Sequence, residues 1–253
     1  MSTPRRPHPL VALAALLLFA AMGLAVAGPA TADAASKRCK ARAGTVYKDG
    51  ATRVFHAGSS LYACTRLTPR GFARTVRLGP WSRGSRAVSN GSYVAWARRW
   101  RIDDQPLDNI WAASIDGRRF LVDSPAIPAS GRGAVDTDAV QRLLVTDYGA
   151  GWVTRRGHVA LAIGAPTGMA PVAIGTPPSP LTADGRRVLV GSFPGVPAAQ
   201  LAATARLSSE TGETDDCGGS MTHTLTVQPP GAADPVGVRW SGGAPISPEI
   251  CNV

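Results

Sequence analysis

Few residues of this chain have the type and spacing that catalysis requires. Nucleophilic catalysis needs a serine or cysteine next to a histidine base that a carboxylate orients. The chain contains four histidines, and it has no Gly-x-Ser-x-Gly sequence, which would mark a nucleophile at a strand-to-helix turn. His158 begins an expected strand and His223 lies within another, so we interpret both as structural. The sequence therefore assigns no catalytic residue.

Acidic pairs and metal-ligand patterns lead to the same conclusion. Asp103-Asp104 and Asp215-Asp216 are the visible carboxylate pairs, but neighbouring residues of an extended chain point to opposite sides. We expect them to be solvated acids of polar loops. No Cys-x-x-Cys sequence occurs, and the histidines lack the spacing of zinc ligands. No cofactor and no metal site is predicted.

Tryptophan and arginine are better candidates, and their chemistry is binding. An exposed aromatic ring can stack on a sugar, and cations beside it can attract an anionic polymer. Trp100 is flanked by Arg98 and Arg101, and these three residues are the candidate binding surface. Buried tryptophans instead pack between sheets. Three others fall in expected strands and should do so: Trp96, Trp111 and Trp152.

The charge balance is basic, with 27 Lys and Arg against 17 Asp and Glu in 253 residues. Such a balance suits an anionic envelope polymer or an acidic protein. The cations are scattered as pairs, such as Arg98-Arg99 and Arg155-Arg156, without a long basic block. We therefore expect an envelope protein or an anionic cell-wall polymer as partner, and not nucleic acid.

The N-terminal segment has the pattern of an export signal. Arg5 and Arg6 precede an uncharged apolar stretch at residues 10–27, and Ala32-Asp33-Ala34 supplies small residues at a cleavage site. We expect a signal peptide at residues 1–34 and a secreted or cell-surface domain at residues 35–253. An uncleaved membrane anchor is the alternative. No later stretch predicts a membrane span.

Four cysteines follow the expected cleavage site: Cys39, Cys64, Cys217 and Cys251. An even number of cysteines in an oxidising compartment predicts two disulfides. Pairing Cys39 with Cys64 and Cys217 with Cys251 closes a short loop at each end of the domain, and this is the pairing we expect. Crossed pairings, which would tie the termini together, remain open.

Short strands must position these residues, because the chain after residue 34 shows almost no helical periodicity. Asn90-Gly91 predicts a type I′ hairpin turn, in which both residues need positive φ, and Asp116-Gly117 predicts a second hairpin. The nearest helix candidate is residues 196–207, and residues 208–220 predict an acidic loop. Strands are expected at residues 53–55, 61–64, 75–78, 86–88, 93–97, 110–114, 120–122, 142–146, 151–154, 158–163, 172–174, 187–190, 222–227 and 236–240.

An internal repeat bears on the architecture. Residues 114–122 and 182–190 share a strand, an Asp-Gly-Arg-Arg turn and a second apolar strand. Many short strands with almost no helix predict an all-β fold. Repeated hairpins favour a propeller-like array of short antiparallel blades, with four to five units of ~40–45 residues each. A β-sandwich is the alternative.

The segment at residues 181–190 resembles the WD40-like repeat of TolB-type β-propellers, with Ala183 where that family usually has proline. Residues 91–96 are similar to the inner strands of such blades. The resemblance implies a secreted, propeller-like scaffold, and the matched positions are turn and core residues. We therefore expect a non-catalytic extracytoplasmic binding or scaffold protein. A secreted hydrolase that acts on cell-envelope polymers is the alternative.

Overall fold

A computed structural model of the chain describes residues 44–49, 52–66, 73–102, 104–125, 138–165, 169–212 and 219–243. Within these ranges the fold is all-β, as predicted, with four antiparallel sheets and one short helix. Several predictions fall outside the described residues: the signal segment at residues 1–34, Cys39, Asp103, Cys217, Cys251 and the pair Asp215-Asp216.

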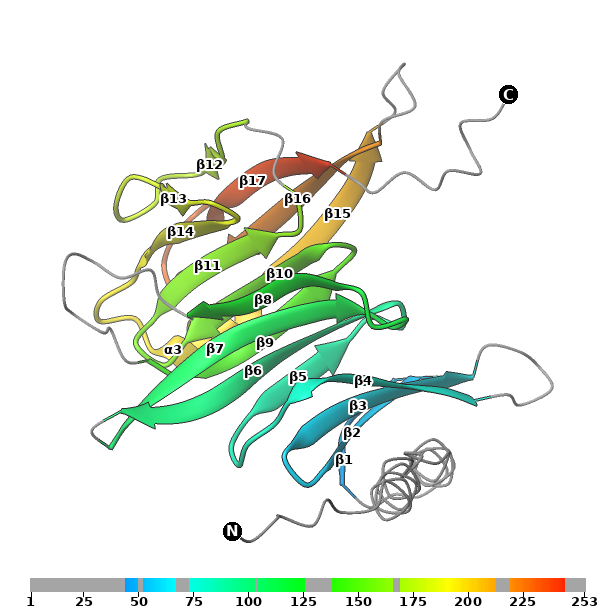
Figure 1. Cartoon of the computed structure of the whole chain (residues 1–253). Coiled ribbons are helices and arrows are strands. Elements are labelled where there is room, and N and C mark those ends of the chain that lie inside the picture. Colours follow the sequence, from blue (N-terminus) through cyan, green and yellow to red (C-terminus); the bar gives the residue numbers. More distant parts are fainter. Residues whose placement is uncertain are drawn as a thin grey trace, which may run out of the picture.

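The first two sheets are meanders, in which each strand pairs with the next along the chain (Figure 1). The first contains β1 (Thr45–Asp49), β2 (Thr52–Ala57), β3 (Ser60–Arg66) and β4 (Ala73–Pro80). The second contains β5 (Arg86–Ser89), β6 (Tyr93–Ile102), β7 (Gln105–Ser114) and β8 (Arg119–Pro125).

The third and fourth sheets are interleaved along the chain, because one strand of the fourth sheet occurs between two strands of the third. The third has the order β13-β14-β11-β10-β9 and the fourth β12-β17-β16-β15, so the chain leaves the third sheet for β12 and then returns. The third contains β9 (Val140–Thr146), β10 (Gly149–Thr154), β11 (His158–Ile163), β13 (Thr182–Asp184) and β14 (Arg187–Ser192). The fourth contains β12 (Val172–Ile174), β15 (Arg206–Gly212), β16 (Ser220–Val227) and β17 (Val236–Gly243).

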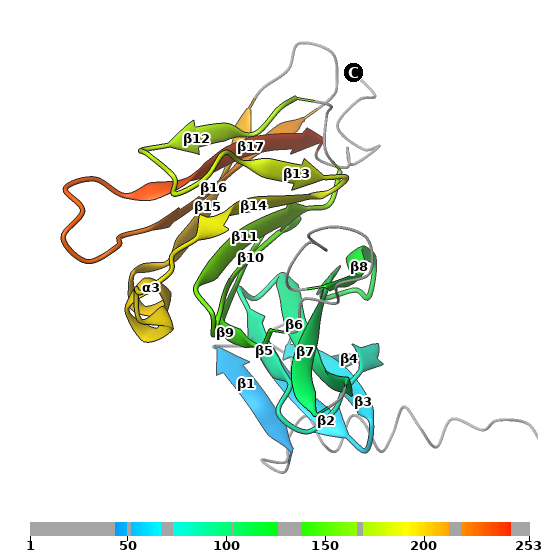
Figure 2. The same ribbon diagram turned by 90° about the vertical axis from the view of Figure 1, so that its left-hand side faces the viewer.

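Three apolar clusters lie between successive sheets, so the sheets stack in the order in which they occur along the chain (Figure 2). Alternation along each strand explains how an inner sheet serves two clusters. In β6, Val94 and Trp96 pack toward the first sheet, whereas Ala95 and Ala97 pack toward the third. Both faces of the second sheet are therefore core. Gly79 fits this packing, because a Cβ there would lie 2.7 Å from the Trp96 ring.

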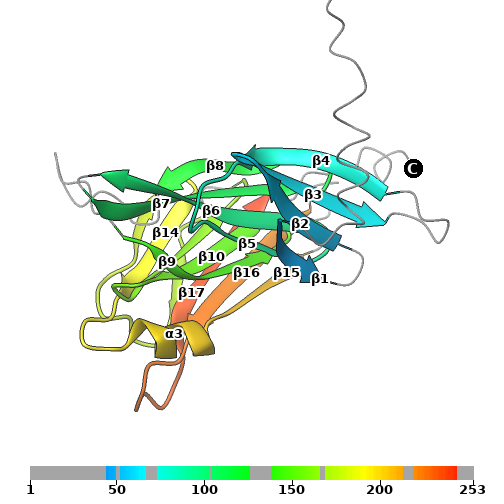
Figure 3. The same ribbon diagram turned by 90° about the horizontal axis from the view of Figure 1, so that it is seen from below.

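One edge strand of each sheet contacts an edge strand of the next. In the first three sheets this is the first strand along the chain, whereas in the fourth it is β15, at the edge opposite β12. β1 contacts β5, β5 contacts β9, and β9 contacts β15. The helix α3 (Ala198–Thr204) contacts β9, β10 and β16, and Figure 3 shows it at the margin of the stack. The edges of successive sheets thus meet along one side, and this convergence creates the cavity described below.

Two local predictions differ from the structure. Residues 208–212 continue β15, although the sequence predicted a loop from residue 208; their polar residues alternate on a sheet face, with Leu207 and Ser209 turned inward. The Asn90-Gly91 hairpin is present, but among the two residues only Gly91 has positive φ, at +97°. Instead the Asn90 side-chain Oδ1 accepts the backbone N–H groups of Ser92 and Tyr93, at 3.1 and 2.8 Å.

The sequence also predicts a propeller-like array of blades. Among the described strands no sheet closes on itself, and they form four sheets. The observed architecture is a stack of antiparallel sheets. No helix within the described residues is long and apolar enough to cross a membrane.

Candidate functional site

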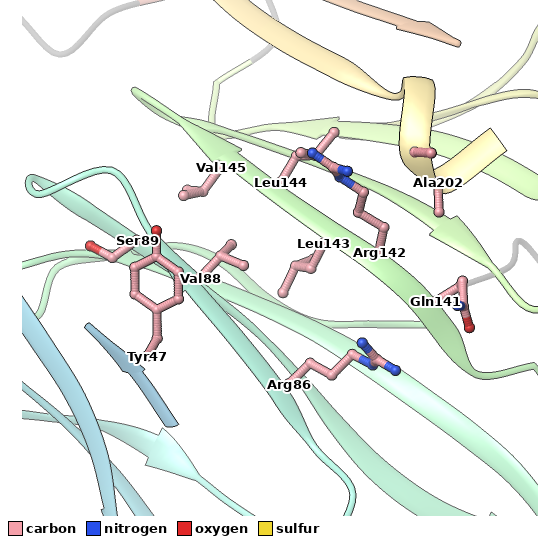
Figure 4. A pocket seen from close by; sticks show the side chains of 11 residues that line it. Tyr47, Arg86, Val88, Ser89, Gln141, Arg142, Leu143, Leu144, Val145 and Ala202 are labelled. Carbon is pink, nitrogen blue, oxygen red and sulfur yellow. The ribbon is translucent and has the colours of Figure 1, made fainter. Parts of the chain in front are cut away.

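A cavity of about 550 Å³ lies where the edge strands converge (Figure 4). Its size is within the range of small-molecule sites. Strands β1, β5 and β9 and helix α3 contribute its lining: Tyr47, Arg86, Val88, Ser89, Gln141, Arg142, Leu143, Leu144, Val145, Ala202 and Ala203.

Strand β9 lines the cavity with both of its faces because it is the edge of its sheet. Leu143 and Val145 belong to the cluster between the second and third sheets, whereas Leu144 packs against the cluster between the third and fourth. Arg142 shares the face of Leu144, since side chains alternate along a strand, and Gln141 lies at a register shift of the β9–β10 pair. The same alternation in β5 places Arg86 and Val88 on one face.

The cavity is cationic. Arg86 and Arg142 line it, and none of its lining residues is acidic. Arg86 is exposed and Arg142 is half-buried. Within the described part of the chain, neither guanidinium forms an ion pair with a carboxylate. Both cations are therefore available to a ligand.

Neutral hydrogen-bonding groups complete the lining. Tyr47 and Ser89 contribute hydroxyls and Gln141 an amide. Burial, and to a smaller degree the charge of Asp49, raises the pKa of Tyr47, so its hydroxyl remains a hydrogen-bond donor at neutral pH. The lining holds no histidine or carboxylate that could act as a general base near neutral pH. The arrangement suits anion binding rather than proton transfer.

The sequence-predicted surface at Arg98, Trp100 and Arg101 is divided between two faces of β6. Arg98 lies over the Trp100 ring, with its guanidinium carbon 3.5 Å from the ring centroid, and Trp100 is 42% exposed. Arg101 is one residue further along the strand and so belongs to the other face. It faces Asp104 at 3.9 Å in an exposed pair. The structure thus unites Arg98 with Trp100 and separates Arg101 from them.

The tryptophans expected in the core lie there. Trp96 and Trp152 are fully buried and Trp111 is nearly so. The rings of Trp96 and Trp111 stack across β6 and β7, with their centroids 5.9 Å apart.

The ion pair of Arg99 and Asp108 joins the neighbouring strands β6 and β7, and a further bond of Asp108 connects this sheet to the third; sequence reasoning did not identify it. Arg99 donates from Nε and Nη2 to the two carboxylate oxygens of Asp108, each at 2.8 Å. Asp108 is fully buried and also accepts the backbone N–H of Val140 at 2.7 Å. Hydrogen bonding to Asp108 raises the pKa of Arg99. This pair is structural, because both of its members are occupied by protein partners.

The two histidines singled out in the sequence have different surroundings. His158 and Ser192 are cross-strand partners of β11 and β14, with Nδ1 and Oγ 2.5 Å apart. His223 is buried between the third and fourth sheets, and its Nδ1 has no hydrogen-bond partner among the described residues. Burial lowers the pKa of His223 to about 4, against a smaller raising effect of Asp147.

Cys64 is the cysteine that the structure describes. It is fully buried in β3 and disulfide-bonded, and its partner lies outside the described residues. The pairing of Cys39 with Cys64 and of Cys217 with Cys251 stays a prediction.

The comparisons with known proteins return no relative: no family model, no curated protein and no solved structure matches the chain. The geometry of the cavity is therefore the basis for inferring a function.

Proposed function

We propose that this chain is an exported, non-catalytic binding module with a propeller-like arrangement of sheets, and that it binds an anionic ligand in the cavity at its edge strands. The observation that carries the proposal is the pair Arg86 and Arg142, which line the cavity with no acidic residue beside them. Guanidinium groups bind carboxylates and phosphates through charge-assisted hydrogen bonds.

The propeller-like part of the proposal has two supports. Four antiparallel sheets are stacked, and one edge strand of each contacts an edge strand of the next, in the series β1, β5, β9 and β15. The two Asp-Gly turns of the repeat that resembles TolB-type propellers both lie in the outermost hairpin of a sheet, β7–β8 and β13–β14. In a propeller the innermost strands surround a central channel, which would be the cavity.

Retention on an agarose resin that presents single carboxylates on neutral alkyl spacers tests the binding proposal. The double variant Arg86→Gln/Arg142→Gln should elute at clearly lower salt than the wild type. Arg155→Gln/Arg156→Gln is the matched control, because these exposed arginines lie outside the cavity and the net charge changes equally. Equal elution of the two double variants would show that only overall charge matters and would contradict the proposal.

A hydrolase is the second candidate, and the short contact between Ser192 and His158 favours it. A serine next to a histidine base is the core of a nucleophilic site. We place it second because the two residues are ordinary cross-strand partners of a regular antiparallel pair. Ester hydrolysis by the wild type that both Ser192→Ala and His158→Ala abolish would overturn the non-catalytic proposal.

A further inference from the structure

The two cavity arginines do not converge on one point. Arg86 extends from β5 and Arg142 from β9, and Figure 4 shows their guanidinium groups in different parts of the cavity, with Leu143 between them. Arg142 lies on the face of β9 that is turned toward α3, whereas Leu143 lies on the face turned toward the second sheet. One compact anion, such as phosphate, would therefore meet one guanidinium and not both.

The surface between the arginines is neutral and partly apolar. Val88 and Leu143 lie in the middle of the cavity, with Tyr47 and Ser89 on the side away from Gln141 (Figure 4). Placing an anionic group against Val88 or Leu143 would remove its hydration without supplying a cation, which is costly. A ligand with a charge at every unit fits this surface poorly.

We propose, on the basis of the proposed function, that the ligand is an extended dianion. It has two anionic groups, carboxylate or phosphate, joined by a neutral segment that spans the cavity. One anionic group binds Arg86 near the opening and the other binds the half-buried Arg142. The neutral segment lies along Val88 and Leu143, and the hydroxyl of Tyr47 is available to its polar atoms. The Ser89 hydroxyl already accepts the backbone N–H of Gly91 at 3.1 Å.

A series of α,ω-dicarboxylates measures this spacing directly. Isothermal titration of the mature protein with the C4, C6, C8, C10, C12 and C16 diacids should give an affinity that passes through a maximum, because only a matched spacer lets both ends bind at once. Dodecanoate, which has the apolar chain and a single carboxylate, is the first reference ligand. Inorganic polyphosphate, charged at every unit, is the second.

The variants identify the two ends. For the best diacid, Arg86→Gln and Arg142→Gln should each weaken binding about tenfold or more, and the double variant should bind no better than a monoanion. Arg155→Gln, an exposed arginine outside the cavity, should leave the affinity unchanged. Circular dichroism and the urea midpoint verify that each variant is folded.

Each other outcome decides a different point. Dodecanoate binding as tightly as the best diacid would overturn the dianion and leave a single-anion site. Polyphosphate binding more tightly than every diacid, with no optimum of length, would overturn it in favour of a uniformly charged polymer. Both results leave the proposed function intact. Failure of all of these anions to bind would overturn the proposed function as well.

Discussion

At the scale of single residues, Arg99 and the cavity arginines differ in their bonding partners, and this difference distinguishes a structural arginine from one proposed to bind a ligand. All three are arginines on strands, but Arg99 is saturated by Asp108, whereas Arg86 and Arg142 face a cavity without a carboxylate. A cation that is bonded to a buried carboxylate of the neighbouring strand has a structural role. A cation that lacks a protein partner at a concave surface is available for a ligand.

The first prediction concerns Asp108. Asp108→Ala leaves Arg99 without its partner and the Val140 N–H without its acceptor, and should lower the free energy of unfolding by about 3 kcal/mol. Asp104→Asn is the control, because Asp104 is fully exposed, its pair with Arg101 is solvated, and asparagine tolerates the φ of +62° at this position; it should leave the urea midpoint unchanged. Equal urea midpoints for the two variants would contradict a stabilising role of the Arg99–Asp108 pair.

The second prediction concerns His223. Burial lowers its pKa from 6.5 to about 4, so folding favours the neutral ring. This contribution is complete above pH 6.5 and is lost as pH falls toward 4, at up to about 1.4 kcal/mol per unit. The urea midpoint of the wild type should therefore fall as the pH is lowered from 6.5 to 5.

The urea midpoint of His223→Gln should change less over this pH range, since glutamine does not titrate. His56→Gln, at an exposed position, should keep the wild-type slope. The same slope in the wild type and in His223→Gln would mean that another group causes the acid sensitivity.

At the scale of elements, the hairpins decide which strands become neighbours. Asn90 is the clearest case, since one side chain accepts two backbone N–H groups and its Nδ2 donates to Asp147 of the β9–β10 turn at 3.1 Å. It therefore closes its own hairpin and also joins the second sheet to the third.

The third prediction follows from this turn. Asn90→Ala removes three hydrogen bonds and should lower the free energy of unfolding by about 1–2 kcal/mol. Asn90→Asp keeps the side-chain acceptor and should retain most of the stability when 0.5 M salt screens its repulsion from Asp147. Thermal unfolding at high salt compares them, and an alanine variant as stable as the aspartate variant would contradict this role of the side chain.

The strands were largely predictable from the sequence, but the cavity was not. Apolar alternation and turn residues identify β2 to β11, and burial of Trp96 follows from its place in an apolar run. Strand β15 was missed because Ser208 and Glu210 make it polar on one face. The sequence placed Arg86 and Arg142 in strands and gave them no role. Their presence in one cavity depends on which edge strands converge, which the sequence does not show. A charged residue in the first strand of two successive sheets was the available signal.

At the scale of the whole molecule, the net charge of +10 gains a more specific meaning. Scattered arginines give a general attraction for anions that salt screens readily, whereas a partly enclosed pair is screened less. Binding in the cavity should therefore persist at salt concentrations that remove non-specific retention.

The fourth prediction concerns export of the whole chain. Expression in a host with a Sec pathway should give a product in the envelope or medium that begins at Ala35, within a few residues, because Ala32 and Ala34 provide the small residues of a cleavage site. Intact-mass spectrometry with N-terminal peptide mapping measures this directly. A product that keeps Met1 and stays in the cytoplasm would contradict export.

The most direct test of dianion binding in the cavity is to locate the bound ligand. A dodecanedioate that carries a diazirine in its chain would be photoactivated with the wild-type protein and the labelled peptides mapped by mass spectrometry. Labels are expected on residues 86–89 and 140–146, and both unlabelled dodecanedioate and the variant Arg86→Gln/Arg142→Gln should remove them. Competable labelling confined to peptides outside the cavity, such as β6 around Trp100, would contradict dianion binding in the cavity.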